Sequence, residues 1–368
     1  MAECFNHFTR IGISDQDVKS RVEECFQTIF FDPKERFFHE VDADSACMVD
    51  TGNMDARTEG MSYGMMMCVQ CDRQDLFDRL WQFSKRYMYH TEGIYAGYFA
   101  WSVGLDGRHN AEGPAPDGEE YFAMALLFAA SRWGNGEGIF DYEAEARDIL
   151  RHCVHQAELV PGGRAMCDPQ NYQIRFVPEA DFTDPSYHLP HFYDLFAERS
   201  DPSDRGFWRH AAKASRAYIV QSAHPITGMS PEYAEFDGTP RLLAHKTFTY
   251  YSDAYRVALN IALDTLWNGP RREYADIASH LQTYFHGIEE PDFMAYQIDG
   301  TPTDEPAMHP VAMTAVLAAA SIASDGPWAD DFLRRFWRTP LRKGKRRYYD
   351  NCLYFFSLLA LAGMYRVY

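Results

Sequence analysis

The sequence predicts an all-α protein built from about twelve helices. Apolar residues recur at helical spacing along most of the chain, whereas the strict alternation that marks β-strands is scarce. No linker rich in proline, glycine or serine divides the 368 residues, and neither a low-complexity tract nor an internal repeat is visible. The helices are therefore expected to share one core, and we predict a single domain over residues 1–368.

The helical pattern can be followed element by element. The first amphipathic stripe consists of apolar residues at positions i, i+4, i+7, i+8 and i+11, namely Val18, Val22, Cys25, Phe26 and Ile29. The same analysis places the helix starts near residues 16, 59, 75, 119, 142, 187, 205, 253, 272, 309, 328 and 348.

Twelve helices joined by alternating long and short connections can close into an inner ring of six, surrounded by an outer ring of six. In such an up-and-down arrangement, every second helix begins at the same end of the molecule. The second, fourth and eighth helices begin with Glu59, Asp117 and Asp253, which are 58 and 136 residues apart. We therefore expect the fold to bring three carboxyl groups together at one end.

Composition argues against several classes of partner. The formal net charge of −18 repels phosphate backbones and anionic lipid surfaces, so we expect a neutral ligand and no nucleic acid. No segment offers the roughly 18 consecutive apolar residues of a membrane span. The first residues contain no basic segment followed by an apolar one, and the eight cysteines are scattered. We expect a cytoplasmic protein with reduced thiols, and the oligomeric state is left open.

Three carboxyl groups among aromatic residues suit the hydrolysis of a glycosidic bond. One carboxylic acid protonates the leaving oxygen, a carboxylate activates water, and flat aromatic faces pack against sugar C–H groups. An aromatic content of 15% agrees with such a site. The same acids also have a structural interpretation, because helix N-termini stabilise carboxylates. Asp117 can cap its helix, with Glu120 as the second half of a capping box.

Three further side chains are candidates for substrate binding. Trp101 lies in a loop or hairpin, "YFAWSVGLDG", where its ring can stack on a sugar or pack over the end of the barrel. Tyr187 begins the sixth helix, where it can help Asp253 hold the attacking water or can be a buried tyrosine with a satisfied hydroxyl. Arg256 follows Asp253 by three residues on the same helix face, so it can pair with that carboxylate or bind a sugar hydroxyl.

We expect neither a metal nor a cofactor. Cys68 and Cys71 form one CxxC motif, but no second pair or nearby histidine completes a zinc site. His188 and His191 lie at i and i+3 without an evident third ligand.

Four segments, in this order, resemble glycoside hydrolase family 8: "TEGMSYGM", "AWSVGLDGRHNAEGPAPDGEEYFAMAL", "SYHLPHFYDLFA" and "YYSDAYRV". The resemblance extends from about Glu40 to Asn351 and is closest to the branch of reducing-end xylose-releasing exo-oligoxylanases. It implies an (α/α)6 barrel, inversion at the anomeric carbon, and short β-1,4-xylo-oligosaccharides as substrates.

The resemblance also implies roles for the three acids. Glu59 in "RTEGMSYGM" matches the general acid of the family, and Asp253 in "SDAYR" matches its general base. Asp117 in "APDGEEY" matches the third acid, which is expected to hold the sugar at the cleavage site. Pro116 and Glu119 differ from the usual pattern, which has a small hydroxyl residue and a second aspartate at these positions. The exo-oligoxylanase branch tolerates the form "DGEEY".

Exo action requires a barrier that closes one end of the cleft. The segment "DEPAMHPVAM" is suited to this, because proline stiffens the loop and the His309 imidazole can hydrogen-bond hydroxyls of a terminal xylose. The resemblance supports this prediction, since the exo-oligoxylanase branch carries a His-Pro loop at this point. In the alternative interpretation, Pro310 is only the first residue of the tenth helix and His309 faces solvent.

Other functions are compatible with the same residues. An endo-acting β-1,4-glycanase of this family, such as an endoxylanase, endoglucanase or chitosanase, would use the same acids in a cleft that is open at both ends. A sugar phosphorylase or epimerase would show phosphate dependence or product without hydrolysis, and a sugar-binding barrel would not need Glu59. The expected cytoplasmic location favours imported oligosaccharides over polymers.

Overall fold

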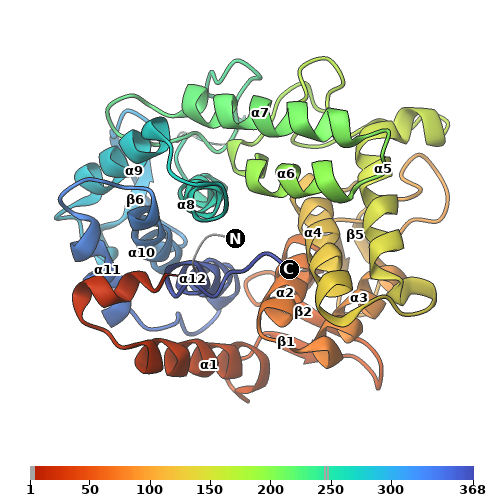
Figure 1. The fold of residues 1–368 in the computed structure, drawn as a ribbon, viewed down its shortest axis with the longest axis horizontal. Helices are drawn as coiled ribbons and strands as arrows, with labels where there is room; N and C mark the ends of the chain where they lie inside the picture. Colours follow the sequence, from red (N-terminus) through yellow and green to blue (C-terminus); the bar gives the residue numbers. More distant parts are fainter. Residues whose placement is uncertain (1–4, 244–245, 247) are drawn as a thin grey trace. The chain divides into compact units, whose positions relative to one another are not determined.

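The computed structural model describes residues 5–243, 246 and 248–368. Within these residues the chain forms twelve α-helices, several short 3-10 helices (η) and seven strands of three to five residues (Figure 1). The α-helices are α1 (Asp15–Phe31), α2 (Thr58–Gln70), α3 (Gln74–Tyr87), α4 (Pro116–Trp133), α5 (Tyr142–Leu159), α6 (Pro190–Arg199), α7 (Arg205–Ser222), α8 (Arg256–Asn268), α9 (Arg272–Phe285), α10 (Pro310–Ala319), α11 (Ala329–Arg338) and α12 (Arg347–Leu361). Each begins within three residues of the start predicted from the sequence, and the largest differences are at α4, α6 and α8.

Two compact units are formed by segments that alternate along the chain. Unit 1 contains Met1–Thr28, Asp181–His191 and Lys213–Arg366, and unit 2 contains Ile29–Ala180, Phe192–Ala212 and Val367–Tyr368. Helices α1, α6 and α7 each contain residues of both units.

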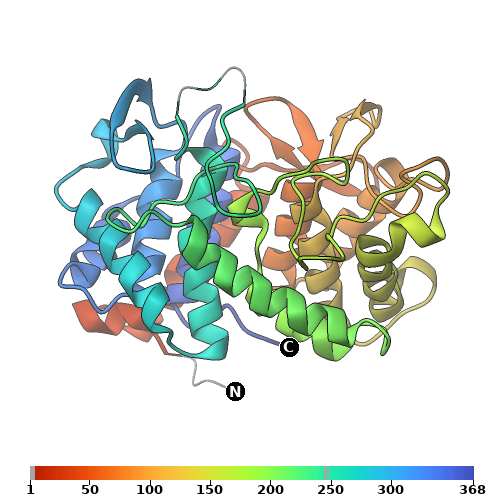
Figure 2. The same ribbon diagram turned by 90° about the horizontal axis from the view of Figure 1, so that it is seen from above.

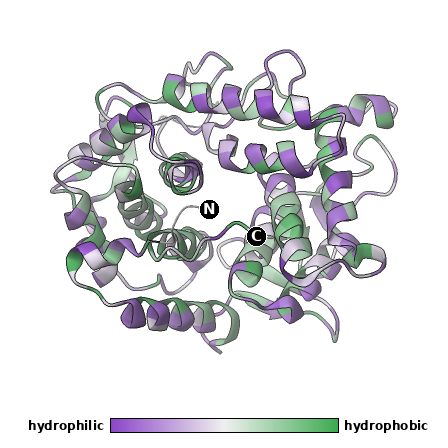
Figure 3. Cartoon of the chain, viewed as in Figure 1, coloured by the Kyte–Doolittle hydropathy of each residue, from purple (hydrophilic) through white to green (hydrophobic). Residues whose placement is uncertain are grey.

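Unit 2 is built around α2 and α4, which pack against each other, while α3 packs on α2 and α5 packs on α4. Almost every side chain of α2 and most of those of α4 are buried, whereas α3 and α5 bury one face. The sequence explains the difference, because "YFAMALLFAA" in α4 is apolar around the whole helix and α3 alternates apolar and charged positions. Figure 3 shows the same contrast, with polar residues marking the exposed face of α5.

Unit 2 also contains a five-stranded antiparallel sheet that the sequence did not reveal. Its strands, in the order in which they pair, are β1 (Phe38–Glu40), β2 (Ala46–Asp50), β3 (Asp55–Arg57), β4 (Ser102–Gly104) and β5 (His109–Ala111). Such short strands give too few residues for an alternating pattern to be recognised. Because α2 begins directly after β3, the sheet lies at the N-terminal end of that helix (Figure 2).

Unit 1 is built around α8, α10 and α12, which pack against one another and are seen nearly end-on in Figure 1. Helix α9 packs on α8, and α11 packs on α10. Helices α10 and α12 are buried on every side, since "VAMTAVLAA" and "CLYFFSLLAL" are apolar on all faces. A two-stranded antiparallel sheet, β6 (Met294–Tyr296) and β7 (Pro302–Pro306), precedes α10.

Candidate active site

The first turns of α2 and α4 lie against each other in unit 2. Glu59 is the second residue of α2, and Asp117 is the second residue of α4. A Cβ atom added at Gly118 would lie only 2.4 Å from Cβ and Oγ1 of Thr58, so the two helices approach more closely than any side chain at position 118 would allow. This contact joins the residue after Asp117 to the residue before Glu59. Unit 2 therefore places the two predicted acids at neighbouring helix ends.

Asp117 does not cap its helix in the predicted way. Helix α4 begins at Pro116, and the N-cap residue Ala115 provides no side-chain hydrogen bond. Proline is favoured at the first helical position, and its presence there places Asp117 inside the first turn. One oxygen of the buried Asp117 carboxylate, Oδ1, accepts a hydrogen bond from the backbone N–H of Gly118 at 2.9 Å. Glu120 accepts a hydrogen bond from the Tyr193 hydroxyl, so the predicted capping box was wrong.

Glu119 is a buried carboxyl group that the sequence analysis noted only as a departure from the family pattern. Its Oε1 accepts a hydrogen bond from the backbone N–H of Phe99 at 3.1 Å. Burial raises the pKa of Glu119 well above its usual value, and the nearby carboxyl of Asp117 contributes in the same direction. The side chain thus ties α4 to the segment that leads to Trp101.

Trp101 is fixed to both neighbouring segments by its backbone. Its N–H donates to the carbonyl of Gly113 at 3.0 Å, and its carbonyl accepts from the N–H of Thr58 at 3.0 Å. The Arg57 guanidinium lies over the half-buried indole, 5.2 Å from the ring centroid. As predicted, the segment is a hairpin, since β4 follows Trp101 and pairs with β5. Three predicted site residues, Glu59, Asp117 and Trp101, are therefore connected within unit 2.

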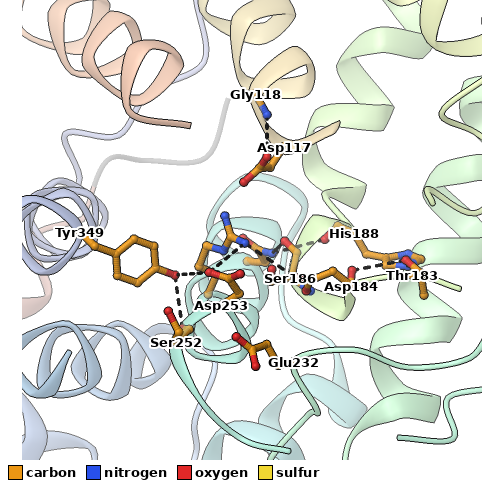
Figure 4. A network of polar contacts seen from close by, with 12 residues as sticks. Asp117, Gly118, Thr183, Asp184, Ser186, His188, Glu232, Ser252, Asp253 and Tyr349 are labelled. Carbon is orange, nitrogen blue, oxygen red and sulfur yellow. Dashed lines mark hydrogen bonds and ion pairs between the residues drawn. The ribbon is translucent and has the colours of Figure 1, made fainter. Parts of the chain in front are cut away.

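Asp253 lies in unit 1 in a 3-10 turn, η4 (Ser252–Tyr255), directly before α8. The sequence predicted that α8 begins at Asp253, but the helix begins at Arg256. The hydroxyl of Tyr349 donates to Asp253 Oδ1 at 3.3 Å and lies 3.3 Å from the carbonyl oxygen of Ser252 (Figure 4). Ser252 has a φ of +34°, a conformation that is costly for a residue with a side chain.

Arg256 forms an ion pair with Asp253, one of the two roles that the sequence left open for it. Its guanidinium lies 3.4 Å from Asp253 Oδ1 and 3.8 Å from Asp184 Oδ2, and the side chain is almost fully buried. The guanidinium also lies 5.3 Å from the centroid of the Tyr187 ring. Tyr187 does not begin α6, because it ends a separate 3-10 turn, η3 (Pro185–Tyr187), and α6 begins at Pro190. Unit 1 nevertheless brings Tyr187, Asp253 and Arg256 together.

Asp184 was missed by the sequence analysis. Its side chain is fully buried and caps η3 by accepting a hydrogen bond from the N–H of Ser186 at 2.7 Å. Burial raises the pKa of Asp184, while Arg256 opposes this shift and Asp253 reinforces it. The Asn260 side chain on α8 donates to the Ser186 carbonyl at 2.8 Å, which further fixes the turn that carries Tyr187.

Glu232 is a second buried acid that the sequence analysis missed. Lys246 donates a hydrogen bond to Glu232 Oε2, and the backbone N–H of Glu232 donates to the carbonyl of Thr249 at 2.6 Å. Burial raises the pKa of Glu232 from 4.5 to about 7, and the negative charge of Asp253 adds to this shift. Neither Asp184 nor Glu232 stands in a helical pattern or a recognised motif, so only the fold reveals them.

His309 is held between a buried acid and an aromatic ring in unit 1. Its Nδ1 lies 2.8 Å from Oδ2 of Asp350, a fully buried carboxylate that also binds Arg342 at 2.6 Å. The imidazole packs on Tyr349 with ring centroids 4.6 Å apart. Pro310 is indeed the first residue of α10, but His309 is buried, so the interpretation of His309 as a solvent-facing residue was wrong.

The histidine pair and Cys68 of the CxxC motif are parts of the packed interior, whereas Cys71 is half-buried. His188 is fully buried, and its two ring nitrogens lie 3.1 Å from Thr183 Oγ1 and 2.9 Å from Ser215 Oγ. Both nitrogens are therefore engaged in hydrogen bonds within the protein. Cys68 is fully buried in α2, and Cys71 follows the last residue of that helix.

The sequence model of glycosyl hydrolases family 8 matches residues 41–362 of this chain. The chain belongs to glycosyl hydrolase family 8. One curated relative is the reducing-end xylose-releasing exo-oligoxylanase Rex8A of Paenibacillus barcinonensis, which is 53% identical over 99% of this chain and 96% of its own length. Another is the reducing-end xylose-releasing exo-oligoxylanase of Halalkalibacterium halodurans, which is 49% identical over 99% of this chain and 94% of its own length. The structure of Rex8A complexed with xylose matches with a TM-score of 0.96 at 53% identity and covers 99% of this chain and 97% of that one.

Membership of family 8 makes the protein a glycoside hydrolase, and its fold class is the (α/α)6 barrel that the sequence predicted. The predicted family is likewise confirmed. Within the described residues, no helix combines the length and the apolar character that are needed to cross a membrane.

Proposed function

We propose that this family 8 enzyme is an inverting hydrolase that releases xylose from the reducing end of short β-1,4-xylo-oligosaccharides. The names and the full-length similarity of its relatives support this substrate class. One observation carries the exo assignment: the loop before α10 is anchored beside the proposed base, because His309 packs on Tyr349 and Tyr349 donates to Asp253. From this position the His309 side chain can contact the sugar next to the cleaved bond.

The three acids have separate proposed roles. Glu59 is the general acid that protonates the leaving oxygen, and Asp253 is the general base that removes a proton from the attacking water. Tyr349 and Arg256 both interact with Asp253 Oδ1, which leaves Oδ2 as the oxygen for the water. Asp117 holds a hydroxyl of the sugar at the cleavage site.

The supporting residues bind and orient the substrate. Trp101 stacks on a sugar ring, and its fixed backbone keeps the indole at a constant position. Tyr187 helps to hold the attacking water, and Arg256 orients the Asp253 carboxylate through their ion pair. These roles use aromatic and polar groups that are already ordered by contacts within the protein.

His309 is the proposed barrier and the group that selects the reducing end. The Nδ1–H group of His309 donates a hydrogen bond to Asp350. This leaves Nε2 to accept a hydrogen bond from a sugar hydroxyl. Arg342 fixes the same loop by donating to the carbonyl of Met308 at 2.5 Å and to Asp350. Because the loop is held from two sides, it can close the cleft after a single xylose.

The test is the digestion of xylotriose labelled at its reducing end, with separation of the products over time. The proposal requires labelled xylose and unlabelled xylobiose as the first products, and xylotriose reduced to its alditol should be a poor substrate. His309→Ala should weaken this end preference before it weakens bond cleavage. Labelled xylobiose as the main product, or a rapid fall in the viscosity of polymeric xylan, would instead support an endo-acting glycanase.

We also propose that residues 1–368 act as one catalytic domain in the cytoplasm. The first proposal is supported by the family match over residues 41–362 and by the alternation of the two units along the chain. The second is supported by Cys25, Cys47, Cys68, Cys153 and Cys167, which form no disulfide and are buried.

A further inference from the structure

Two imidazoles and one carboxylate form a cluster on the surface of unit 2. His90 follows α3, His109 belongs to β5, and Glu112 follows that strand directly. One possible ligand atom from each side chain lies within 4.8 Å of the others. Among the residues that the structure describes, this is the one group of three histidine, cysteine, aspartate or glutamate side chains that meets this condition. Unlike His188, His191 and the two CxxC cysteines, these three residues form no spacing pattern in the sequence that indicates a metal site.

The ring of His109 is already oriented as in a metal site. Its Nε2 lies 3.0 Å from the carbonyl oxygen of Tyr87, which can only accept a hydrogen bond, so Nε2 carries a hydrogen. The opposite nitrogen, Nδ1, lies 2.8 Å from Glu112 Oε2. Histidines that bind metals usually donate their other N–H to a carbonyl or carboxylate in this way. Nδ1 and the Glu112 carboxylate can therefore bind a cation between them.

His90 supplies the third ligand from the segment that follows α3. Its Nε2 lies 4.0 Å from Glu112 Oε2 and 2.8 Å from the backbone carbonyl of Glu112, and its ring centroid is 5.1 Å from that of His109. On metal binding, His90 Nε2 gives up its hydrogen bond to the Glu112 carbonyl and binds the ion instead. The side chains of His90, His109 and Glu112 are 12%, 26% and 68% exposed, so an ion can enter from solvent and keep a water ligand.

We propose that His90, His109 and Glu112 bind a divalent transition-metal ion such as Zn²⁺ at this surface. Two neutral imidazole nitrogens and one carboxylate oxygen suit Zn²⁺, Ni²⁺ or Cu²⁺, and a water completes a tetrahedral Zn²⁺ site. Mg²⁺ and Ca²⁺ prefer sites made of oxygen ligands and do not suit this set.

The bound ion would join the segment that follows α3 to strand β5 and to the residue directly after it. Glu112 precedes Gly113, whose carbonyl accepts from the N–H of Trp101, and the Trp101 carbonyl accepts from the N–H of Thr58. The ion therefore reinforces the segment that carries Trp101. Its role is to stabilise this segment and not to take part in bond cleavage.

Isothermal titration of chelator-treated, tag-free protein with ZnCl₂ tests the proposal, with CaCl₂ and MgCl₂ in parallel. We expect one equivalent of Zn²⁺ to bind and the other two ions to give no binding heat. With free Zn²⁺ 100-fold above its Kd, the unfolding temperature should rise by about 3–5 °C. Absence of one-to-one binding by Zn²⁺ would overturn the proposal.

Two variants and one control assign the binding to the cluster. His109→Ala and Glu112→Gln should each weaken Zn²⁺ binding by more than the roughly 10–100-fold that loss of an orienting partner costs. His109→Ala could disturb the fold, whereas Glu112 is largely exposed, so Glu112→Gln leaves the fold intact and still tests the site. His39→Ala, at an exposed histidine of β1 outside the cluster, should bind as the parent does. Unchanged affinity in Glu112→Gln would contradict the proposed ligand set.

Discussion

Glu59 and Asp117 lie in the first turns of regular α-helices in unit 2, whereas Asp253 lies in a 3-10 turn of unit 1. In unit 2 the positions of the acids follow from the backbone, because Gly118 allows the first turn of α4 to touch Thr58. A helix start, a proline and a glycine are enough to specify this arrangement. These signals are local in the sequence.

In unit 1 the carboxylate of Asp253 is held by side chains from distant segments. Tyr349 comes from α12, and Arg256, which begins α8, is itself buried beside Asp184. The strained backbone at Ser252 is retained within this network. The comparison shows that one proposed catalytic group can be placed by helix packing while another depends on a network of polar contacts. Substitutions should therefore affect the two regions in different ways.

The largest expected effect comes from the proposed acid and base themselves. Glu59→Gln and Asp253→Asn should each lower the rate of xylotriose hydrolysis by about 10²–10⁴-fold, the usual contribution of general acid–base catalysis. Circular dichroism should show an unchanged fold. If either variant kept activity within threefold of the parent, that residue would have to be removed from its role.

The backbone contact in unit 2 is tested by Gly118→Ala. The new Cβ would stand 2.4 Å from the Thr58 side chain and 3.2 Å from its carbonyl carbon, so the first turns of α2 and α4 must separate. We expect a loss of about 1–3 kcal/mol in the free energy of unfolding and a fall of roughly 100-fold in kcat/KM, because small displacements of catalytic groups are costly. Gly206→Ala is the matched control, since no atom lies within 4 Å of a Cβ at that helical position. Equal activity of the two variants would show that the close approach does not matter.

The side-chain network in unit 1 is tested by Tyr349→Phe, which removes a hydroxyl and keeps the ring against His309. Loss of one hydrogen bond to the Asp253 carboxylate should lower kcat about tenfold, which corresponds to roughly 1.4 kcal/mol. Tyr284→Phe, which loses a hydrogen bond to the Gly300 carbonyl, serves as a control for the general loss of a tyrosine hydroxyl. A drop of the same size in both variants would speak against a specific role for Tyr349.

A smaller effect is expected on the pH dependence of stability, through Glu232. Its folded pKa of about 7 lies above the usual 4.5, so the folded protein binds more protons than the unfolded chain between these values. Glu232 therefore contributes its full stabilisation below pH 4.5. As the pH rises to 7 this contribution is lost, and the free energy of unfolding falls by up to about 3 kcal/mol. In urea unfolding, the free energy of unfolding should fall less between pH 5 and pH 7.5 for Glu232→Gln than for the parent. An identical decline in both proteins would exclude this contribution.

The difference between the units also explains how much of the molecule could be predicted. The helices were located because each contains either a long apolar stripe or a continuous apolar run, and Glu59 and Asp117 were found because they lie at the starts of such helices. The starts of α4, α6 and α8 were less accurate because Pro116 begins α4 and separate 3-10 turns precede α6 and α8.

Buried acids without a pattern of their own could not be found in advance. Asp184, Glu232 and Asp350 are recognisable only from what they contact, namely Arg256, Lys246 and His309 respectively. The sheet of unit 2 was missed for a related reason, since its strands are short and lie between helices. Family resemblance supplied the roles of the acids, and these roles stay predictions until the variants are measured.

The central claim is that Glu59 and Asp253 act as acid and base in a single displacement by water. Such a pair requires the two carboxyl groups to stand roughly 6.5–9.5 Å apart, with room for the water, and it inverts the anomeric configuration. Proton NMR of the first products of xylotriose hydrolysis tests this directly, before mutarotation mixes the anomers. The account predicts that the new reducing end of xylobiose appears first as the α-anomer. Initial appearance of the β-anomer would mean retention through a covalent intermediate and would contradict the assignment of Asp253 as the base.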